Sequence, residues 1–571
     1  MDIAARLRRR GEALWRAWPA VWAVAAILAA AIAAQARFGA IADVSWMITI
    51  GERWLDGQSP YVDFIETNPP VSIVLYLPAV ALARMIGARP ELVVAAYGFA
   101  AVGASLWLSA AILRRAGLGA EVGAIALGLT LAALTILPGR TFDERDFFVA
   151  LFALPYLALC AARAGRAPVD SRMTLVAGLG LGAMVAIKPP YALIAVALAP
   201  YLASRIGVAA LLRALEYYVA AAFLAAAAAL TIWRFPAYGA DVLPTVVAAY
   251  LPVRESMLQL FANAGVVVWV ALFGLLAAIA GRRVREPLVA TPALASLGAA
   301  GAFIVQGKGW LYQFYPALAL LVVALGAALE MRPQPPRRLA AAGGAAGATA
   351  VGALLFRLPP IDCAIGAALA AHLALAAAPP RVAQSSRERV ARLAEMTAAA
   401  LIAAACALYC APVPGPDAAF ARAVADLGPH PRLASVGEGL GVGFPLVRNV
   451  GGVWVQRTQG MLMTAGARRL IDQNPHDGAL AERLAPIIAR DRDMTAEDIE
   501  RNRPDGVLVS NLGPRFHQWA MSDPKLAAAL ADYRFMIASG AKDWPIDLYV
   551  RADLIGLRPT LSAPDASGRA Q

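Results

Sequence analysis

The chain has 571 residues, 60% of them hydrophobic, and its mean hydropathy is +0.60. Ordinary globular domains are only about 45–50% apolar, so the composition excludes a purely soluble protein and indicates a polytopic membrane protein. A net charge of +12 could suggest a nucleic-acid partner. The arginines cluster between the apolar runs, however, as the positive-inside rule produces, and no nucleic-acid partner is implied. The four cysteines lie in apolar segments without metal-ligand spacing.

Apolar runs of about 17 to 25 residues, each long enough to cross a bilayer as a helix, recur through the first 411 residues. A basic segment precedes the first run, which predicts an uncleaved first span with a cytoplasmic N-terminus; a signal peptide is the alternative. We predict about thirteen spans, at residues 17–37, 91–113, 118–137, 147–163, 173–187, 190–204, 215–233, 263–281, 288–306, 313–331, 339–356, 361–379 and 393–411.

Residues 71–88 decide which side of the membrane every later loop occupies. They are apolar enough to cross, but they follow two prolines and contain Pro78 and Arg84. If they lie on the outer surface as a juxtamembrane helix, most loop arginines fall on the cytoplasmic side, as the positive-inside rule requires. We therefore predict an outer loop over residues 38–90. With an odd number of spans, residues 412–571 lie on the same outer side.

Residues 412–571 contain no further spanning segment and form a predicted soluble α/β domain. Short apolar runs at 432–436, 452–457, 506–510 and 546–551 predict strands, and helix-like stretches lie at 461–473 and 514–531. The sequence TAED at 495–498 has the pattern of a capping box that opens a helix.

Charged side chains from distant loops gather on the predicted outer face. They come from the acidic loop after the first span, from the loop TFDERDFF and from three later span boundaries: Asp43, Asp63, Glu66, Arg140, Glu144, Arg145, Asp146, Lys188, Arg254 and Lys308. Because a charge beside a bilayer core is costly, such residues are functional candidates. Lys188 also fits a lysine that only extends its ammonium group to the interface.

The order of short motifs over residues 1–330 resembles the GT-C integral membrane glycosyltransferases, and most closely the aminoarabinose-transferase and protein O-mannosyltransferase type. The motifs are D-x-x-W at 43–46, G-x-x-W-L-x-G-x-x-P-Y-x-D ending in Pro-Pro at 51–70, ERDFFVALFALPYL, AIKPPYAL, and K-x-x-x-Y-x-x-x-P at 308–316. The resemblance implies transfer of a sugar from a polyprenyl-phosphate carrier to a glycan, lipid or protein acceptor by inverting displacement. It also implies location in the cytoplasmic membrane, with an extracytoplasmic C-terminal domain.

Matching of the motifs places Asp43 at the family's catalytic position as the general base. Asp146 and Glu66 match the two further acids of the site. The other charged candidates, with Tyr312, are expected to bind the substrates: Asp63, Glu144, Arg145, Arg140, Lys188, Arg254 and Lys308. A divalent cation held by Asp43, Glu66 and Asp146 is left open. Related sequences often carry His near Gln313 or Tyr315, and this chain has none there.

The expected fold is thus mostly α: a GT-C membrane domain over 1–411 with juxtamembrane helices in its first outer loop, and a C-terminal α/β domain over 412–571. A transporter or flippase for a lipid-linked glycan is the alternative function. Transporters usually place polar groups near the midplane and show repeated halves, whereas the charges here gather at one face, which favours the enzyme.

Overall fold

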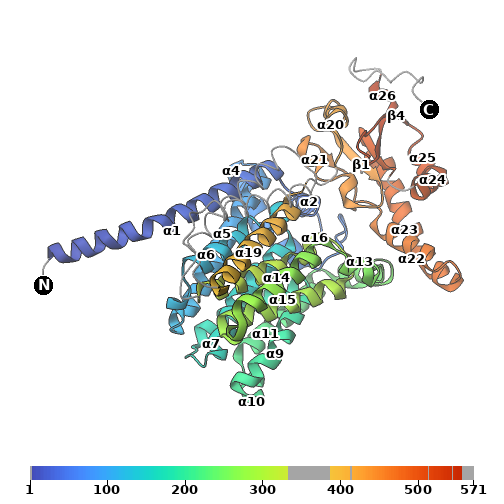
Figure 1. Cartoon of the computed structure of the whole chain (residues 1–571). Helices are drawn as coiled ribbons and strands as arrows, with labels where there is room; N and C mark the ends of the chain where they lie inside the picture. Colours follow the sequence, from blue (N-terminus) through green and yellow to red (C-terminus); the bar gives the residue numbers. More distant parts are fainter. Residues whose placement is uncertain (1–2, 332–385, 412–414, 512–513, 543, 556–571) are drawn as a thin grey trace. The chain divides into compact units, whose positions relative to one another are not determined.

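The computed structural model describes residues 3–331, 386–411, 415–511, 514–542 and 544–555 (Figure 1). Contacts between Cα atoms divide the chain into two compact units. The first, here called the helical unit, comprises Met1–Gly39, Ala95–Ala226 and Glu255–Pro412. The second, the mixed unit, comprises Ala40–Val94, Ala227–Arg254 and Val413–Gln571. The predicted acidic loop therefore shares a compact unit with the C-terminal part of the chain.

The helical unit consists of long apolar helices joined by short turns. Its helices are α1 (Ile3–Phe38), α5 (Pro90–Arg115), α6 (Ala124–Thr135), α7 (Arg145–Ala164), α8 (Ser171–Ile187), α9 (Ala192–Ile206), α10 (Val208–Leu212), α11 (Leu215–Arg234), α13 (Met257–Phe261), α14 (Ala264–Ala280), α15 (Pro287–Gln306), α16 (Leu311–Glu330) and α19 (Ser386–Cys410). Single turns of 3-10 helix are η1 (Gly119–Glu121), η2 (Gly139–Thr141), η3 (Pro189–Tyr191) and η6 (Gly281–Arg285). Helix α5 begins in the mixed unit, and helix α11 ends in it.

Seven helices of the described residues are long and apolar enough to cross a membrane, which makes this a multi-pass membrane protein. They correspond to the predicted spans at 17–37, 91–113, 147–163, 215–233, 263–281, 288–306 and 313–331. Four other predicted spans are helices with shorter apolar stretches: α6, α8, α9 and α19. The predicted spans at 339–356 and 361–379 lie outside the described residues.

Small residues bring the helices of this unit close together, as membrane helices require in the absence of a hydrophobic driving force. Almost every residue of α7 is buried. Where α15 crosses α9, a Cβ atom on Gly298 would lie 2.5 Å from the backbone oxygen of Leu193. Only glycine fits at that crossing, which explains one of the glycines in the Ala-rich runs.

The mixed unit combines the segment after the first span with a small α/β domain. Its helices are α2 (Ala42–Leu55), α3 (Pro70–Val74), α4 (Leu77–Ile86), α12 (Leu243–Thr245), α20 (Ala418–Ala425), α21 (Leu446–Asn449), α22 (Leu462–Gln473), α23 (Gly478–Asn502), α24 (Pro514–Ser522), α25 (Pro524–Ala529) and α26 (Ala552–Ile555). Two π-helical turns, η4 (Tyr238–Val242) and η5 (Val246–Tyr250), flank α12, and the 3-10 turn η7 spans Leu440–Val442.

Residues 71–88, predicted as one juxtamembrane helix, are broken into α3 and α4. Neither helix, of 5 and 10 residues, is long enough to cross a bilayer, since a span needs about 20 residues.

The sheet of the mixed unit has five strands in the order β2-β1-β3-β5-β4. The strands are β1 (Arg432–Val436), β2 (Val453–Trp454), β3 (Gly506–Ser510), β4 (Tyr533–Ala538) and β5 (Ile546–Arg551). β1 pairs in parallel with β2 and β3, whereas β5 is antiparallel to β3 and β4. The central strand β3 is buried along its whole length, which explains its continuous apolar run, GVLVS.

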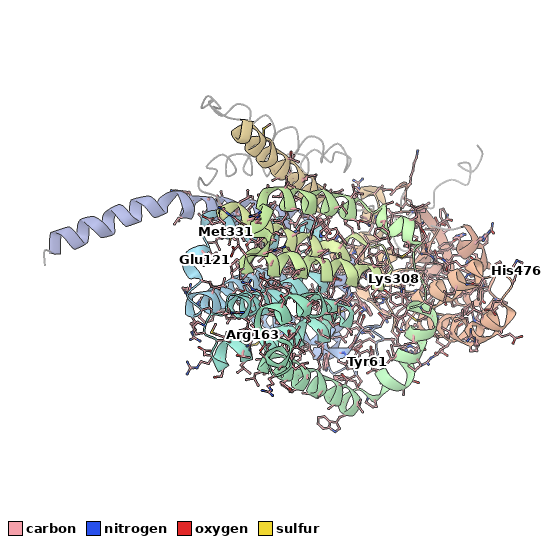
Figure 2. The ribbon with its side chains drawn as sticks, turned by 60° about the horizontal axis from the view of Figure 1, so that its bottom comes forward. Tyr61, Glu121, Arg163, Lys308, Met331 and His476 are labelled. Atoms are coloured by element: carbon pink, nitrogen blue, oxygen red, sulfur yellow. The ribbon has the colours of Figure 1, made fainter. Side chains whose placement is uncertain are left out.

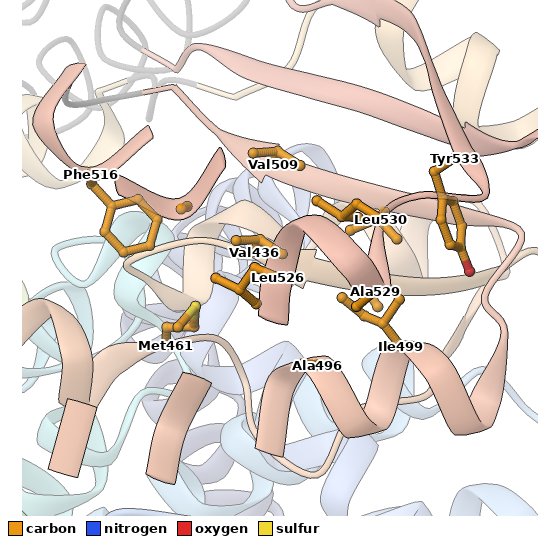
Figure 3. Close-up of a cluster of buried hydrophobic side chains, with 13 residues drawn as sticks. Val436, Met461, Ala496, Ile499, Val509, Phe516, Leu526, Ala529, Leu530 and Tyr533 are labelled. Atoms are coloured by element: carbon orange, nitrogen blue, oxygen red, sulfur yellow. The ribbon is translucent and has the colours of Figure 1, made fainter. Parts of the chain in front are cut away.

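Helices α23, α24 and α25 and the loop before α22 cover one face of this sheet with an apolar core (Figure 3). Val436 of β1 and Val509 of β3 meet Ile499 of α23, Phe516 of α24 and Leu526 of α25 in this cluster. The strands at 432–436, 506–510 and 546–551 agree with the predicted ones. β4 was not predicted, and the predicted strand at 452–457 is reduced to two residues.

The predicted helix start at TAED is wrong, because these residues lie inside the 25-residue helix α23. Thr495 donates its hydroxyl hydrogen to the carbonyl of Asp491 in the same helix, at 2.8 Å. Asp498 is buried and accepts hydrogen bonds from the backbone and guanidinium of Arg457, each at 2.8 Å. Both side chains are therefore used within the helix and across the domain, not as caps.

Candidate functional site

Asp43, the expected general base, lies in the first turn of α2 in the mixed unit and is half-buried. The partial positive charge at a helix N-terminus favours a carboxylate there. Trp46 lies three residues further along and is fully buried, so the two side chains occupy one side of the helix. An ionised carboxylate is the form that a general base requires.

Glu66 is brought to this same helix by the loop that follows it. Its carboxylate is buried, and it accepts a hydrogen bond of 2.6 Å from Trp46 Nε1 and one of 2.8 Å from the backbone N–H of Asn68. The side-chain amide of Asn68 also donates to it. Donors of this kind stabilise the charged form of a buried carboxylate. The sequence did not reveal Trp46 as the partner of Glu66.

Asp63, which was expected to bind substrate, holds the turn of its own loop. Its Oδ2 accepts a hydrogen bond of 2.7 Å from the backbone N–H of Ser59, and its carbonyl accepts one of 2.8 Å from Arg53. Arg53 also reaches the carbonyl of Gln456 at 2.6 Å, which ties the loop to the C-terminal domain within the same unit. Arg254, another expected substrate residue of the mixed unit, is exposed.

A cavity of about 60 Å³ lies beside this loop. Ile65 and Thr67, the neighbours of Glu66 in sequence, line it together with Asp241, Thr458 and Asp491. A space of this size admits a few water molecules or one small polar group. Burial raises the pKa of Asp491 to about 6.

Arg448 of α21 fixes α2 to the C-terminal domain within the mixed unit. Its Nη1 and Nη2 donate to the two carboxylate oxygens of Glu52 at 2.6 and 3.0 Å. Its Nε donates to Glu91 at 2.6 Å, and Nη1 also reaches Thr49 at 3.2 Å. Such a bidentate contact imposes orientation as well as attraction, so Arg448 positions the helix that carries Asp43.

We expect Arg448→Ala to destabilise the protein by about 1.5–3 kcal/mol, because the substitution removes hydrogen bonds to charged partners that are only partly exposed. Arg448→Lys should recover part of the loss, since an ammonium group keeps the charge but not the forked geometry. Thermal unfolding of the detergent-purified protein measures the effect. Arg422→Ala is the control, because Arg422 is exposed and donates to the carbonyl of Ala418 in its own helix. Equal melting temperatures for the Arg448→Ala and Arg422→Ala variants would contradict the positioning role.

A second cluster lies in the helical unit around Asp146. Asp146 is buried in the first turn of α7, and its carboxylate pairs with Lys188, which ends α8. The hydroxyl of Tyr191 also donates to Asp146 and lies 2.9 Å from the carbonyl oxygen of Gln313. The ammonium nitrogen of Lys188 lies 5.1 Å from the centre of the Tyr312 ring, within range of a cation–π contact.

Three of the expected site residues, Asp146, Lys188 and Tyr312, thus come together from three separate helices or helix ends. Lys188 is only 9% exposed, so its partner is a carboxylate and not the membrane interface. Tyr191 was not among the expected residues. In the sequence, Tyr191 could have been recognised by its position in the motif AIKPPYAL, directly after the two prolines.

The loop before α7 holds the remaining expected residues of this region. Glu144 and Arg145 are buried and form an ion pair of 3.5 Å. Arg140 is half-buried with its guanidinium 5.2 Å from the centre of the Phe38 ring, and burial lowers its pKa to about 10. The chain passes close to α5 here, since a Cβ atom on Gly98 would lie 1.8 Å from Oδ1 of Asp143.

Lys308 lies between α15 and α16 and is only 9% exposed. Figure 2 shows it at the opposite end of the helical unit from Arg163 and Met331. α7 runs from Asp146 to the end marked by Arg163, and α16 runs from the loop of Lys308 to Met331. Lys308 and the pair of Asp146 with Lys188 therefore occupy one end of the helices, and their place on the outer face stays a prediction.

The carboxylates expected to hold a divalent cation are engaged with protein donors. Glu66 accepts hydrogen bonds from Trp46 and Asn68, and Asp146 accepts them from Lys188 and Tyr191. Among the described residues no group of three or more His, Cys, Asp or Glu side chains comes together in a way that could hold a metal ion. Glu66 and Asp146 thus already have protein partners for their charge, and a divalent cation at Asp43, Glu66 and Asp146 stays an untested prediction.

Comparison with solved structures identifies the fold. The chain is similar to ArnT from Cupriavidus metallidurans bound to undecaprenyl phosphate, with a TM-score of 0.56 and 15% identity over 96% of this chain and 99% of ArnT. For ArnT in the apo state the TM-score is 0.53 and the identity 17%, over 93% and 98% of the two chains. The oligosaccharyltransferase of Archaeoglobus fulgidus gives 0.41 and 12%, over 93% and 74%.

No protein-family model matches the sequence, and comparison with curated proteins gives no match. At 15–17% identity the likeness to ArnT concerns the fold, and it extends over nearly the full length of both chains. The resemblance to GT-C glycosyltransferases that the sequence motifs carried is confirmed at this level. The chain has the fold of ArnT from Cupriavidus metallidurans.

Proposed function

We propose that the protein is a membrane glycosyltransferase that moves a sugar from a polyprenyl-phosphate carrier to a glycan, lipid or protein acceptor. The observation that carries this proposal is the end-to-end likeness to an ArnT structure that binds undecaprenyl phosphate, a polyprenyl phosphate. It is supported by the buried or half-buried charged groups of both units, which a purely structural membrane helix bundle would not need.

The reaction we propose is an inverting displacement at the anomeric carbon of the donor sugar. The acceptor hydroxyl forms the new carbon–oxygen bond and gives its proton to the carboxylate of Asp43, the general base. The bond between the anomeric carbon and the phosphate oxygen breaks, and the electron pair stays on the carrier phosphate. A carboxylate near the anomeric carbon also stabilises positive charge that develops there.

The charge left on the carrier phosphate requires a cation. We assign this role to the cationic candidates Arg140, Arg145, Lys188, Arg254 and Lys308, of which the arginines can bind phosphate through two nitrogens at once. Glu66, Asp63, Glu144, Asp146 and Tyr312 are proposed to orient sugar hydroxyls. The restrained positions of Glu66 and Asp146, each held by two or more hydrogen-bonded groups, suit that role.

The proposal is tested with the purified full-length protein in liposomes that contain a lipid-linked sugar. A transferase releases the polyprenyl phosphate only when an acceptor is present, and the product carries the sugar with inverted stereochemistry. Movement of the intact lipid-linked sugar between leaflets without release would instead support the transporter. Mass spectrometry of envelope glycans and lipids from a strain that lacks the protein then identifies the sugar and the acceptor.

We also propose that the N-terminus of the protein lies in the cytoplasm and its C-terminal domain on the outer side of the cytoplasmic membrane. We expect a reporter enzyme fused after Gln571 to be active only on the outer side, because an odd number of spans follows a cytoplasmic N-terminus. A fusion at residue 283, in the Arg-rich segment 282–285, is the matched control and should report only the cytoplasm. A cytoplasmic signal from the fusion after Gln571 would contradict both the span count and an outer site.

A further inference from the structure

A broad open groove lies on the surface of the mixed unit between α22 and α24, away from the residues given roles above. Six of its lining residues are polar or aromatic side chains: Arg468, Arg515, His517, Gln518, Trp519 and Ser522. None of these residues takes part in the proposed transfer. The lining contains two arginines and a histidine but no acid, so the groove presents positive charge.

The core packing of α24 explains why these side chains face outward. Phe516 and Ala520, four residues apart, are buried in the apolar core (Figure 3 labels Phe516). Residues four apart share one helix face, so Arg515, Gln518 and Ser522 are left for the outer side. All three are exposed or half-exposed, and Trp519 packs only partly against the core.

Arg468 of α22 is held in place by that tryptophan. Its guanidinium carbon lies 4.7 Å from the centre of the Trp519 ring, a cation–π contact. A guanidinium that is already oriented loses less conformational entropy when it binds an anion. Burial raises the pKa of the nearby Glu438, and the charge of Arg468 opposes that rise.

Arg515 is weakly engaged by other side chains. Arg515 is 84% exposed, and its Nη1 lies 3.9 Å from Asp472, which is also mostly exposed; pairs of this kind contribute little in water. His517 Nε2 is itself buried, 3.5 Å from an oxygen of the buried Asp547, so that nitrogen does not face the groove. Arg515 therefore remains able to donate to a ligand.

We propose that this groove binds a sugar that carries a phosphate group. The phosphate is bound by Arg468 and Arg515, which present forked donors to its oxygens. The side chains of Gln518 and Ser522 supply donors and acceptors for sugar hydroxyls. This site is independent of the proposed transfer reaction. A phosphate beside a ring of hydroxyl groups occurs in soluble sugar phosphates and in the headgroups of inositol phospholipids, and the experiment separates these two sources.

The test uses ligand-observed NMR with the full-length protein in detergent and four probes: glucose 1-phosphate, glucose, inorganic phosphate and dihexanoyl phosphatidylinositol. We expect glucose 1-phosphate to bind at least tenfold more tightly than either glucose or inorganic phosphate. Tighter binding of dihexanoyl phosphatidylinositol would identify a lipid headgroup as the ligand, and tighter binding of glucose 1-phosphate a soluble sugar phosphate. Inorganic phosphate that binds as well as glucose 1-phosphate would overturn the proposal.

Variants locate the binding in the groove. Arg468→Gln and Arg515→Gln should each weaken binding of glucose 1-phosphate at least tenfold. Arg515 is highly exposed, so its substitution leaves the fold intact. The Arg515 variant therefore still tests the site if the Arg468 variant unfolds because it loses the contact with Trp519. Arg422→Gln removes an exposed arginine outside the groove and is the control. Unchanged binding in the Arg515 variant, or an equal loss in the Arg422 variant, would refute the proposed site.

Discussion

Asp43→Asn should lower the rate of sugar transfer by at least about 10²-fold, because general-base catalysis contributes about 10²–10⁴-fold. Asparagine has nearly the same shape as aspartate but cannot accept the proton of the acceptor hydroxyl at neutral pH. Asparagine also fills nearly the same volume at this half-buried position at the start of α2. Expression and binding of the lipid-linked donor should therefore stay close to those of the unsubstituted protein.

The measurement is acceptor-dependent release of polyprenyl phosphate in liposomes, together with donor binding in the absence of acceptor. Asp56→Asn is the matched control. Asp56 caps the other end of α2, is more than half exposed and forms an ion pair of 2.6 Å with the equally exposed Arg84. Its loss should leave transfer unchanged. Retention of more than a few per cent of the activity by the Asp43 variant would exclude Asp43 as the base.

The long helices of the fold could be predicted from the sequence because each long apolar run by itself indicates a segment that lies in the membrane. A run of about 20 apolar residues has few alternatives to a spanning helix, and seven of the predicted spans have that length and composition here. The C-terminal strands with continuous apolar runs, such as β3, were predicted for the same reason. β4 was missed because it is an edge strand whose residues are partly exposed, which leaves little apolar pattern.

The wrong helix start at TAED has a tertiary cause. A Thr followed by an acid three residues later is a local capping signal, but Asp498 is engaged by Arg457, 41 positions away. That pairing, and the bond from Thr495 to its own helix, make the sequence compatible with a helix interior. Local signals of this kind are overridden when the side chains find distant partners.

The residues of the candidate site were easier to predict than their partners. Charges next to apolar runs attract attention because they are costly there, which singled out Asp146, Lys188 and Glu66. The partners Tyr191 and Trp46 are neutral aromatic residues, and each contacts its acid across 20 or 45 positions. Neither spacing follows from helix or strand periodicity, so only the three-dimensional fold reveals the contact.

The pair of Asp146 with Lys188 gives the sharpest separation of a structural from a functional role. Lys188→Met or Asp146→Asn alone should destabilise the protein by about 3–5 kcal/mol, because either substitution leaves one buried charge without its opposite. The double variant removes both charges and should recover most of that stability. If the pair also binds substrate, as proposed, the double variant should remain inactive although it is stable.

Unfolding in detergent and transfer in liposomes are measured for the same set of variants. The control is the pair of Arg163 with Glu216, which has a similar geometry at 2.7 Å with a fully buried acid but lies at the opposite end of α7 from Asp146. Its double variant, Arg163→Met with Glu216→Gln, should recover both stability and transfer. If the Asp146 and Lys188 double variant also regains transfer, the pair only holds α7 to α8. If the stable Asp146 and Lys188 double variant is inactive while the Arg163 and Glu216 double variant is active, the pair takes part in the reaction.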